Sequence, residues 1–257
     1  MIQEKQTILA NIEIAPNIYE LTLSGNMVDT MIPGQFVHIQ VPRQDLILRR
    51  PISVAKIDLD SKCYTVLIRT DGEGTTSICE AHAGSLLDVL GPLGNGFDTQ
   101  FLSRNSNVLL LGGGIGVPPL LGLAHELNKQ EINLQIILGF HTKSAVVYEE
   151  EFKRYGKTIV STDDGSYGIL GNVSIVYNLI YSDTQFDAIY ACGPKGLNRM
   201  VNQLFADHPH AYISLEEHMG CGIGACAACI CQKQDNPQEN IKICQHGPVF
   251  KTGEVIV

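Results

Sequence analysis

The sequence EEHMGCGIGACAACIC at residues 216–231 ends on Cys231 and holds three earlier cysteines, Cys221, Cys226 and Cys229, in the spacing C-x4-C-x2-C. One distant cysteine, Cys244, follows Cys229 after fourteen further residues. Glycine and alanine fill most positions between the first three cysteines, and such small residues let the backbone wrap closely around whatever the thiolates hold. A fourth thiolate from a separate segment would then close the site.

This spacing is typical of the plant-type [2Fe–2S] cluster site. Zinc sites more often pair two short C-x2-4-C knuckles, and disulfides need an oxidising compartment, which nothing in the chain indicates. Both remain as alternatives. We expect a [2Fe–2S] cluster on Cys221, Cys226, Cys229 and Cys244, and we expect Cys231 to be a small buried hydrophobic residue. Because such a cluster moves one electron at a time, the chain should carry electrons.

The composition is that of a folded, acidic protein. The chain has 257 residues, 44% of them hydrophobic, and a formal net charge of −9. This length suffices for two compact domains with a small addition. The negative charge argues against binding to nucleic acid or to an anionic membrane surface. No stretch approaches the roughly 20 apolar residues of a membrane span, and the N-terminus lacks the pattern of a signal peptide. We therefore expect a cytoplasmic protein.

The first hundred residues contain short apolar runs, separated mostly by Pro, Gly, Asn or Asp. Such regular spacing predicts strands of an antiparallel barrel or sandwich. The runs lie at residues 7–14, 18–23, 35–41, 52–57, 63–69 and 85–90. The sequence GPLGNG at 91–96 should then interrupt regular structure and link this region to the next.

From Asn107 onward, expected strands alternate with expected helices, which is the pattern of a doubly wound α/β domain. The strands are expected at 108–111, 134–140, 157–161, 187–192 and 212–215, and the helices at 117–128, 149–155, 173–180 and 196–205. The sequence therefore predicts a β-barrel domain at residues 1–100, an α/β domain at 101–213 and a small cluster domain at 214–257.

Two short motifs in the β region could hold a phosphorylated cofactor. In RRPIS at 49–53, Arg50 could pair with a phosphate through charge-assisted hydrogen bonds, and Ser53 could bond the edge of an isoalloxazine ring. In GEGTT at 72–76, backbone N–H groups and a hydroxyl could bind a pyrophosphate. Taken singly, the motifs also fit an ordinary charged edge strand and an ordinary turn.

Three motifs in the α/β region lie where ligands bind such sheets. A glycine loop follows the buried strand at 108–111 and is a candidate dinucleotide loop, although Val117 occupies the place of a third glycine. Cys192-Gly193-Pro194 ends an expected strand, where open α/β sheets bind ligands, but a buried core thiol is the alternative. The sequence TDDGS at 162–166 could face a ribose hydroxyl, and a solvated turn is the simpler interpretation.

In this order, the motifs resemble those of the ferredoxin–NADP reductase superfamily. There, an R-x-[YF]-[ST] motif holds FAD, and Ile52 stands here in place of the aromatic residue that stacks on the flavin. The resemblance implies an FAD site at Arg50, Pro51, Ile52, Ser53, Leu67, Ile68, Arg69, Gly74 and Thr75. It also implies that NAD binds at the glycine loop with Cys192, the expected catalytic residue, beside the nicotinamide. The loop glycines concerned are Gly112, Gly113, Gly114 and Gly116.

Longer blocks narrow the resemblance to the electron-transfer subunits of type B dihydroorotate dehydrogenase. These blocks are LRRPIS, GGGIGVPPL, TDDGSYG, YACGPKGLNRM, EEHMGCGIGACAACIC and the late C-x-x-GPVF, and residues 216–250 are the most specific. The family implies that dihydroorotate reduces FMN on a separate catalytic subunit during de novo pyrimidine biosynthesis. Electrons then cross singly through the cluster to FAD, which reduces NAD⁺. The family also implies a heterotetramer of two plus two subunits.

Other functions remain open at this stage. A small FAD/[2Fe–2S] subunit of an NADH-dependent ferredoxin:NADP oxidoreductase, or of a hydrogenase diaphorase, would share the same cofactors and cysteine loop. Only the partner protein would distinguish it. A redox sensor or scaffold would instead lack bound flavin and NADH-driven activity. No position clearly chooses between NAD and NADP, but no basic cluster for a 2′-phosphate is evident, which favours NAD.

Overall fold

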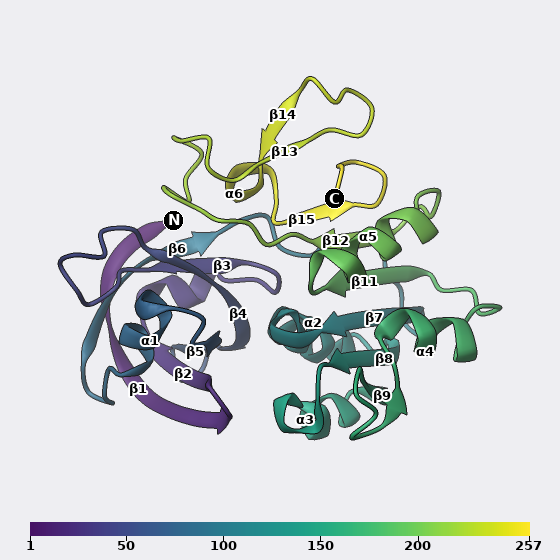
Figure 1. The fold of residues 1–257 in the computed structure, drawn as a ribbon, viewed down its shortest axis with the longest axis horizontal. Coiled ribbons are helices and arrows are strands. Elements are labelled where there is room, and N and C mark those ends of the chain that lie inside the picture. The colour runs from purple at the N-terminus through teal and green to yellow at the C-terminus, as the bar shows by residue number, and fades with distance from the viewer.

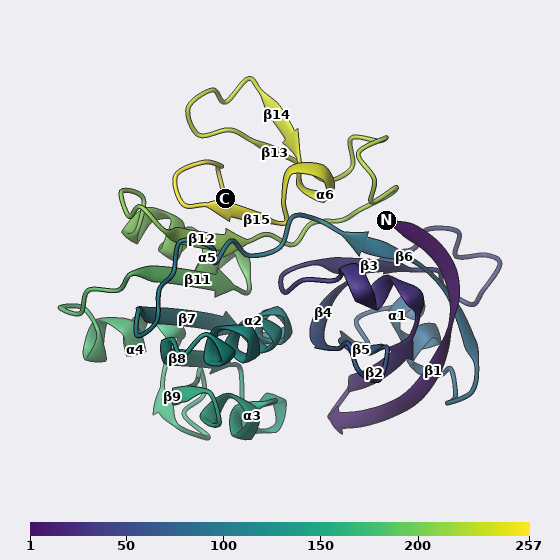
Figure 2. The ribbon, with the colours of Figure 1, turned by 180° about the vertical axis from the view of Figure 1, so that it is seen from behind.

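The computed structural model describes residues 1–257 and consists of three parts (Figure 1). A closed six-stranded barrel lies beside a seven-stranded sheet covered by helices, and a small C-terminal segment lies across one end of both. The view from behind shows the same contact of the C-terminal segment with barrel and sheet (Figure 2). None of the helices has the length and hydrophobicity that crossing a bilayer requires.

The N-terminal barrel is antiparallel throughout, as the sequence predicts. It closes because β6 pairs with both β1 and β3. Its strands, in the order β1-β2-β5-β4-β3-β6, are β1 (Ile2–Ala15), β2 (Ile18–Ser24), β5 (Cys63–Arg69), β4 (Arg50–Asp58), β3 (Phe36–Ile39) and β6 (Leu86–Leu93). Inward-facing apolar side chains such as Leu21, Val54 and Val66 fill the barrel. Two short helical segments, η1 (Asn26–Thr30) and α1 (Glu73–Cys79), complete this part.

The expectation that residues 91–96 interrupt regular structure is wrong for the first half of that stretch. Strand β6 continues to Leu93, because pairing with β1 and β3 supplies hydrogen bonds that outweigh the local preference of Gly91 and Pro92. The chain leaves the strand only at Gly94, whose φ of +83° lies in the left-handed region.

The middle part is a doubly wound α/β structure, which confirms the predicted fold class. Its sheet has the order β10-β9-β8-β7-β11-β12-β15, and only the pairing of β15 with β12 is antiparallel. The strands are β7 (Asn107–Gly113), β8 (Asn133–Phe140), β9 (Gly156–Thr162), β10 (Ile169–Leu170), β11 (Ala188–Cys192), β12 (Ala211–Ser214) and β15 (Val249–Lys251). The helices are α2 (Val117–Lys129), α3 (Glu149–Lys153), α4 (Val173–Ile180) and α5 (Lys195–Leu204), with 3₁₀ turns η2 (Gly114–Gly116) and η3 (Lys143–Ala145).

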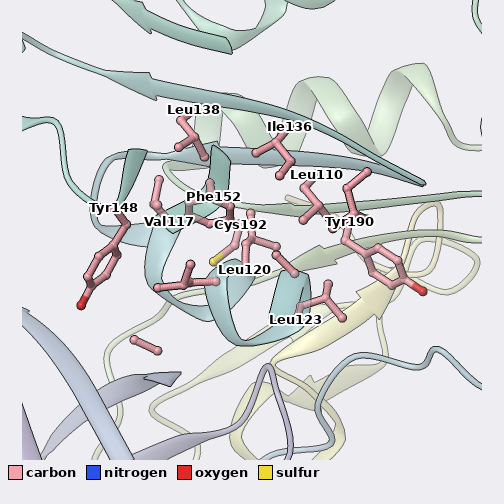
Figure 3. Close-up of a cluster of buried hydrophobic side chains, with 14 of the residues drawn as sticks. Leu110, Val117, Leu120, Leu123, Ile136, Leu138, Tyr148, Phe152, Tyr190 and Cys192 are labelled. Carbon is pink, nitrogen blue, oxygen red and sulfur yellow. The ribbon is translucent and has the colours of Figure 1, made fainter. Parts of the chain in front are cut away.

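Two apolar cores lie on the two faces of this sheet. On one face, Leu110, Leu120 and Ile136 pack between the strands and α2 (Figure 3). On the other face, the core beneath α4 and α5 extends under the C-terminal segment and includes Cys229 and Cys244. Full burial of one such leucine contributes about 1.5–3 kcal/mol, so the cysteine segment is held to the sheet largely by apolar packing.

The C-terminal segment carries little regular structure of its own. It contains the two-stranded sheet of β13 (Ile230–Gln232) and β14 (Asn240–Lys242), the short helix α6 (Ile243–His246), and β15. Asn95, in the stretch after β6, donates from Nδ2 to the carbonyl oxygens of His246 and Val249 at 3.0 and 2.8 Å. The segment is thus tied both to the sheet and to the connection between the other two parts.

Candidate flavin cavity and cysteine loop

A cavity of about 490 Å³ lies where the three parts meet. The barrel, the η2–α2 turn, the start of α5 and the segment after β12 all contribute to its walls. Seven of the nine residues expected at the FAD site line it: Pro51, Ile52, Ser53, Leu67, Ile68, Arg69 and Thr75. They come together because β4 and β5 are antiparallel neighbours, which places the beginning of one strand beside the end of the other. The cavity has the size and mixed lining of a ligand site.

The two remaining residues of the expected FAD site, Arg50 and Gly74, lie against each other. A Cβ atom built on Gly74 would come within 2.4 Å of Nη2 of Arg50, so only glycine allows the guanidinium to lie there. Arg50 has no carboxylate partner, and its Nη1 donates to the carbonyl oxygen of Leu48 at 2.7 Å. An uncompensated guanidinium beside the first turn of α1 fits a phosphate group.

Charged residues that the sequence reasoning missed also reach the cavity. Lys195, at the start of α5, pairs with Glu217 at 2.5 Å. Glu216 is exposed to the cavity, but surrounding protein excludes much of the water; this desolvation raises the pKa of its carboxyl group, and the charge of Arg69 opposes the shift. Only their positions in the sequence indicated them. Glu216 directly follows the last expected strand, and Lys195 lies between the expected strand at 187–192 and the helix that follows it.

The glycine loop and the CGP motif pack against each other at the carboxyl ends of β7 and β11. A Cβ on Gly116 would lie 2.5 Å from Cα of Gly193, and one on Gly113 would lie 2.7 Å from Cδ of Pro194. Gly112 faces Val117 and Leu138, whereas Gly114, with φ +52°, borders open space. These neighbouring strands form the point where the strand order reverses, at which open α/β sheets bind ligands. Binding of NAD by the loop stays a prediction.

Cys192 ends β11 and is completely buried among the apolar side chains that pack around α2 (Figure 3). Its side chain does not line the cavity, although Ser214, its neighbour across the β11–β12 pairing, does. Burial raises the pKa of the Cys192 thiol well above its usual value, with a further contribution from Glu216. The thiol is therefore protonated and lies one layer beneath the cavity wall, and its catalytic role stays a prediction.

The acidic sequence TDDGS forms a turn after β9, as the simpler interpretation expected. Asp164 accepts from the backbone N–H of Ser166 at 3.0 Å and from its hydroxyl at 2.6 Å. These hydrogen bonds lower the pKa of Asp164 to about 2. The structure does not bring this turn to the cavity.

The fold places the segments that carry the four cysteines of the C-x4-C-x2-C…C pattern next to one another. The backbone N–H of Cys226 donates to Sγ of Cys221 at 3.3 Å, and that of Gly224 donates to Sγ of Cys244 at 3.2 Å. The N–H of Ile243 donates to the carbonyl oxygen of Cys229 at 2.9 Å, which fixes the fourth cysteine beside the third. Glycines with φ of +71° and +81°, at positions 222 and 224, allow this tight winding.

The loop provides an environment for sulfur that carries negative charge. Burial raises the pKa of Cys221, but backbone N–H groups of Cys226, Ile223 and Ala225 outweigh it and lower the pKa to about 6. N–H groups aimed at sulfur are what a cysteine-bound iron–sulfur cluster uses, so the loop fits such a group. No three or more His, Cys, Asp or Glu side chains are arranged to hold a metal ion, and the ligand set stays a prediction.

Cys231 differs from the expectation of a buried residue. It is half-buried, because it packs only partly against the core beneath the C-terminal segment and borders a second cavity beside α5. Burial raises the pKa of its thiol to about 11. No backbone N–H bond to its sulfur is present, in contrast to Cys221 and Cys244.

Comparisons with known proteins agree with this arrangement. The family model described as the iron-sulfur cluster binding domain of dihydroorotate dehydrogenase B matches residues 216–256. The electron transfer subunit of dihydroorotate dehydrogenase B (NAD(+)) from Streptococcus pneumoniae serotype 4 is 49% identical over 250 residues, covering 97% of this chain and 99% of that protein. The corresponding subunit from a Geobacillus species is 47% identical over the full length of both.

Solved structures show the same fold. A chain of the NADH-dependent reduced ferredoxin-NADP oxidoreductase has a TM-score of 0.86 at 26% identity, with 98% of this chain and 89% of that chain covered. Phthalate dioxygenase reductase has a TM-score of 0.65 at 16% identity, with 90% and 88% covered. Because identity near one half extends over the whole length, the chain belongs to the family of electron transfer subunits of dihydroorotate dehydrogenase B (NAD⁺).

Proposed function

We propose that this chain passes electrons from dihydroorotate oxidation, carried out on an FMN-containing partner subunit, through a [2Fe–2S] cluster and FAD to NAD⁺. This places it in de novo pyrimidine biosynthesis as an NAD-linked oxidoreductase subunit. The observation that carries the proposal is the single cavity shared by the barrel motifs and by the segment that leads into the cysteine loop. A flavin bound there lies next to both the nucleotide-binding sheet and the cluster.

Each part of the chain has a distinct task in this proposal. Arg50 and the start of α1 bind the cofactor phosphates, while Ser53 and the β5 residues orient the flavin ring. The cysteine loop holds the cluster, and Met219, two residues before Cys221, also lines the cavity. The flavin, when bound, exchanges two electrons with NAD and single electrons with the cluster, while the protein sets distance and potential.

The cluster explains why this chain is one subunit of a larger enzyme. A two-electron exchange between one substrate and NAD⁺ needs no one-electron carrier unless electrons cross an interface. The names of the relatives describe an electron transfer subunit, which supports a separate catalytic subunit; we propose an assembly of two plus two from the family resemblance. We place the complex in the cytoplasm, because all eight cysteines are free. Residues 1–100, 101–213 and 214–257 are the proposed domains.

A second candidate follows from the NADH-dependent reduced ferredoxin-NADP oxidoreductase, whose chain matches at a TM-score of 0.86. For this second function, the chain would bind the same cofactors but assemble with a different partner protein. Identifying the partner protein therefore distinguishes the two functions.

Anaerobic mixing with dihydroorotate tests the proposal. The chain, loaded with FAD and cluster, should reduce artificial acceptors with NADH, but dihydroorotate alone should leave its flavin oxidised. Adding the FMN-containing catalytic subunit should make dihydroorotate bleach the flavin. Rapid bleaching without a partner, or no bleaching with it, contradicts the proposed function.

A further inference from the structure

Strand β3 presents two buried faces. Val37 and Ile39 point into the barrel core. Phe36 belongs instead to the core beneath the C-terminal segment, together with Cys229 and Cys244. His38 alternates with Val37 and therefore lies on the Phe36 face, where its side chain is 0% exposed. The imidazole ring of His38 is thus buried between the barrel and the cysteine segment.

Neither ring nitrogen of His38 has a hydrogen-bond partner within the chain. Burial, and secondarily the charge of Arg49, lower the pKa of the His38 imidazole to about 4, so the ring is neutral near pH 7. A neutral imidazole keeps one N–H donor and one acceptor. Leaving such groups unpaired is costly, which points to a partner that the polypeptide itself does not provide.

The ring faces the cysteine loop. A Cβ built on Gly222 would lie 2.8 Å from both Nδ1 and Cε1 of His38, so the imidazole rests directly against the residue that follows Cys221. Any other residue at position 222 would push the ring away. The glycine therefore serves close approach as well as its φ of +71°.

Hydrogen bonds from Arg49 and from two neighbouring strands hold the backbone of His38 in place. Nη1 of Arg49 donates to the carbonyl oxygens of His38 and Asp88 at 3.3 and 2.9 Å, and Nη2 pairs with the Asp88 carboxylate at 2.5 Å. Strand β3 is also paired on both edges, with β4 and with β6. The imidazole is thus positioned on rigid structure rather than on a mobile loop.

We propose that His38 donates its ring N–H to a sulfur atom of the cluster held by the cysteine loop and so raises the cluster's reduction potential. The inference rests on the proposed function only in requiring that cluster. Reduction adds negative charge to the sulfur, and hydrogen bonds to sulfur stabilise that charge. The backbone N–H groups of the loop act from the C-terminal segment itself, whereas His38 adds a donor from the barrel.

Pulsed EPR of the full-length, cluster-loaded and reduced chain tests this contact without altering the protein. With ¹⁵N-histidine labelling, a weak coupling typical of a nitrogen that is not a ligand is expected. It should persist in His218→Gln and His246→Gln, which change the other histidines near the loop. Absence of that coupling, its loss in either variant, or a strong coupling from a directly bound nitrogen overturns the inference. A chain without any cluster signal would instead refute the proposed function.

Potentiometric titration of the EPR signal tests the effect on potential. His38→Leu should lower the reduction potential of the cluster by about 59 mV. At a fixed solution potential, this changes the ratio of reduced to oxidised cluster about tenfold in favour of the oxidised form, for one electron. His38→Gln, which keeps an N–H donor, should recover part of that fall. The matched control Val37→Ala loosens the same strand from its other face and should leave the potential unchanged. An unshifted potential in His38→Leu, or an equal shift in Val37→Ala, overturns the inference.

Discussion

At the scale of single residues, the chain uses glycine to bring polar side chains close to the backbone. Gly74 lies beneath the guanidinium of Arg50, and Gly222 lies beneath the imidazole of His38. In both places a Cβ would come within 3 Å of the ring or guanidinium atoms. The two glycines thus belong to the proposed cofactor sites as much as the side chains that they admit.

Arg50→Ala should weaken the retention of FAD much more than the fold. Loss of one charge-assisted phosphate contact costs about 1.5–3 kcal/mol, or roughly ten- to a hundredfold in affinity. Fluorescence titration of the flavin-free protein measures it. Arg43→Ala is the matched control, because Arg43 is exposed and already paired with Asp45 and Glu73. Equal FAD affinity in the two variants would remove Arg50 from the site.

In the cluster-free chain, the pKa of the Cys221 thiol should be about 6, well below the value near 9 of an unperturbed thiol. Alkylation of Cys221 by iodoacetamide, followed by peptide mass spectrometry, should therefore rise through pH 6 in the folded chain and only near pH 8–9 in urea. Since the folded pKa is depressed, the contribution to stability is complete above pH 9 and is lost as the pH falls through 6. The same pH profile in folded and unfolded chain would show that the loop N–H groups do not act on this sulfur.

At the scale of elements, the cysteines near the loop differ in what surrounds their sulfur atoms. Cys221 and Cys244 accept backbone N–H bonds at sulfur, whereas Cys226, Cys229 and Cys231, the last of them on β13, accept none. The loop creates a site only because α6 carries Cys244 back to it. Regular elements therefore serve here mainly to return a distant thiol to the loop.

Cys226→Ser should abolish the [2Fe–2S] cluster, and Cys231→Ser should leave it assembled. The reason is that Cys226 lies within the C-x4-C-x2-C spacing and in the loop, while Cys231 lies on the strand beyond it. Iron and acid-labile sulfide, each about two per chain for this cluster, together with EPR, measure the outcome. Loss of the cluster in Cys231→Ser but not in Cys229→Ser would show that the spacing selects the wrong cysteine.

At the scale of the whole molecule, the candidate cofactor cavity is lined by residues of the barrel, the sheet region and the C-terminal segment. Figure 1 shows these three parts side by side. Asn95 is a central link, since its side chain donates to His246 and Val249 carbonyls and accepts from the Val249 N–H at 3.2 Å. Strand β15 then continues into the sheet beside β12. The position of the cysteine loop relative to the flavin cavity depends on these contacts.

Asn95→Ala should destabilise the docking of the C-terminal segment. Three hydrogen bonds are lost and partly buried backbone groups are left unpaired, at a cost of about 1–3 kcal/mol. Limited proteolysis of the segment and thermal unfolding of the cluster-free chain measure the effect. Asn128→Ala, at an exposed position near the end of α2, is the control and should behave like the unaltered chain. Identical proteolysis of both variants would show that Asn95 is not a link.

Much of the fold could be predicted from the sequence because its signals are local. The expected strand at 63–69 and the expected helix at 173–180 have the observed bounds, since the apolar pattern and the flanking turn residues agree. Short elements escaped detection. Helix α1 has seven residues and β15 has three, which is too few for a periodic pattern.

The sequence by itself determined the order of barrel, α/β sheet and cysteine loop, the FAD-type motifs and the four spaced cysteines, because each is encoded within a few neighbouring residues. Only the tertiary structure decided that β6 runs through Gly91 and Pro92, that Lys195 and Glu216 reach the cavity, and that Cys192 lies beneath its wall. The burial of His38 was also decided by the tertiary structure. The alternation of side chains along β3 shows which face of the strand His38 lies on, but not which segment covers that face. Packing between residues far apart in the chain settles such questions, and no local pattern records it.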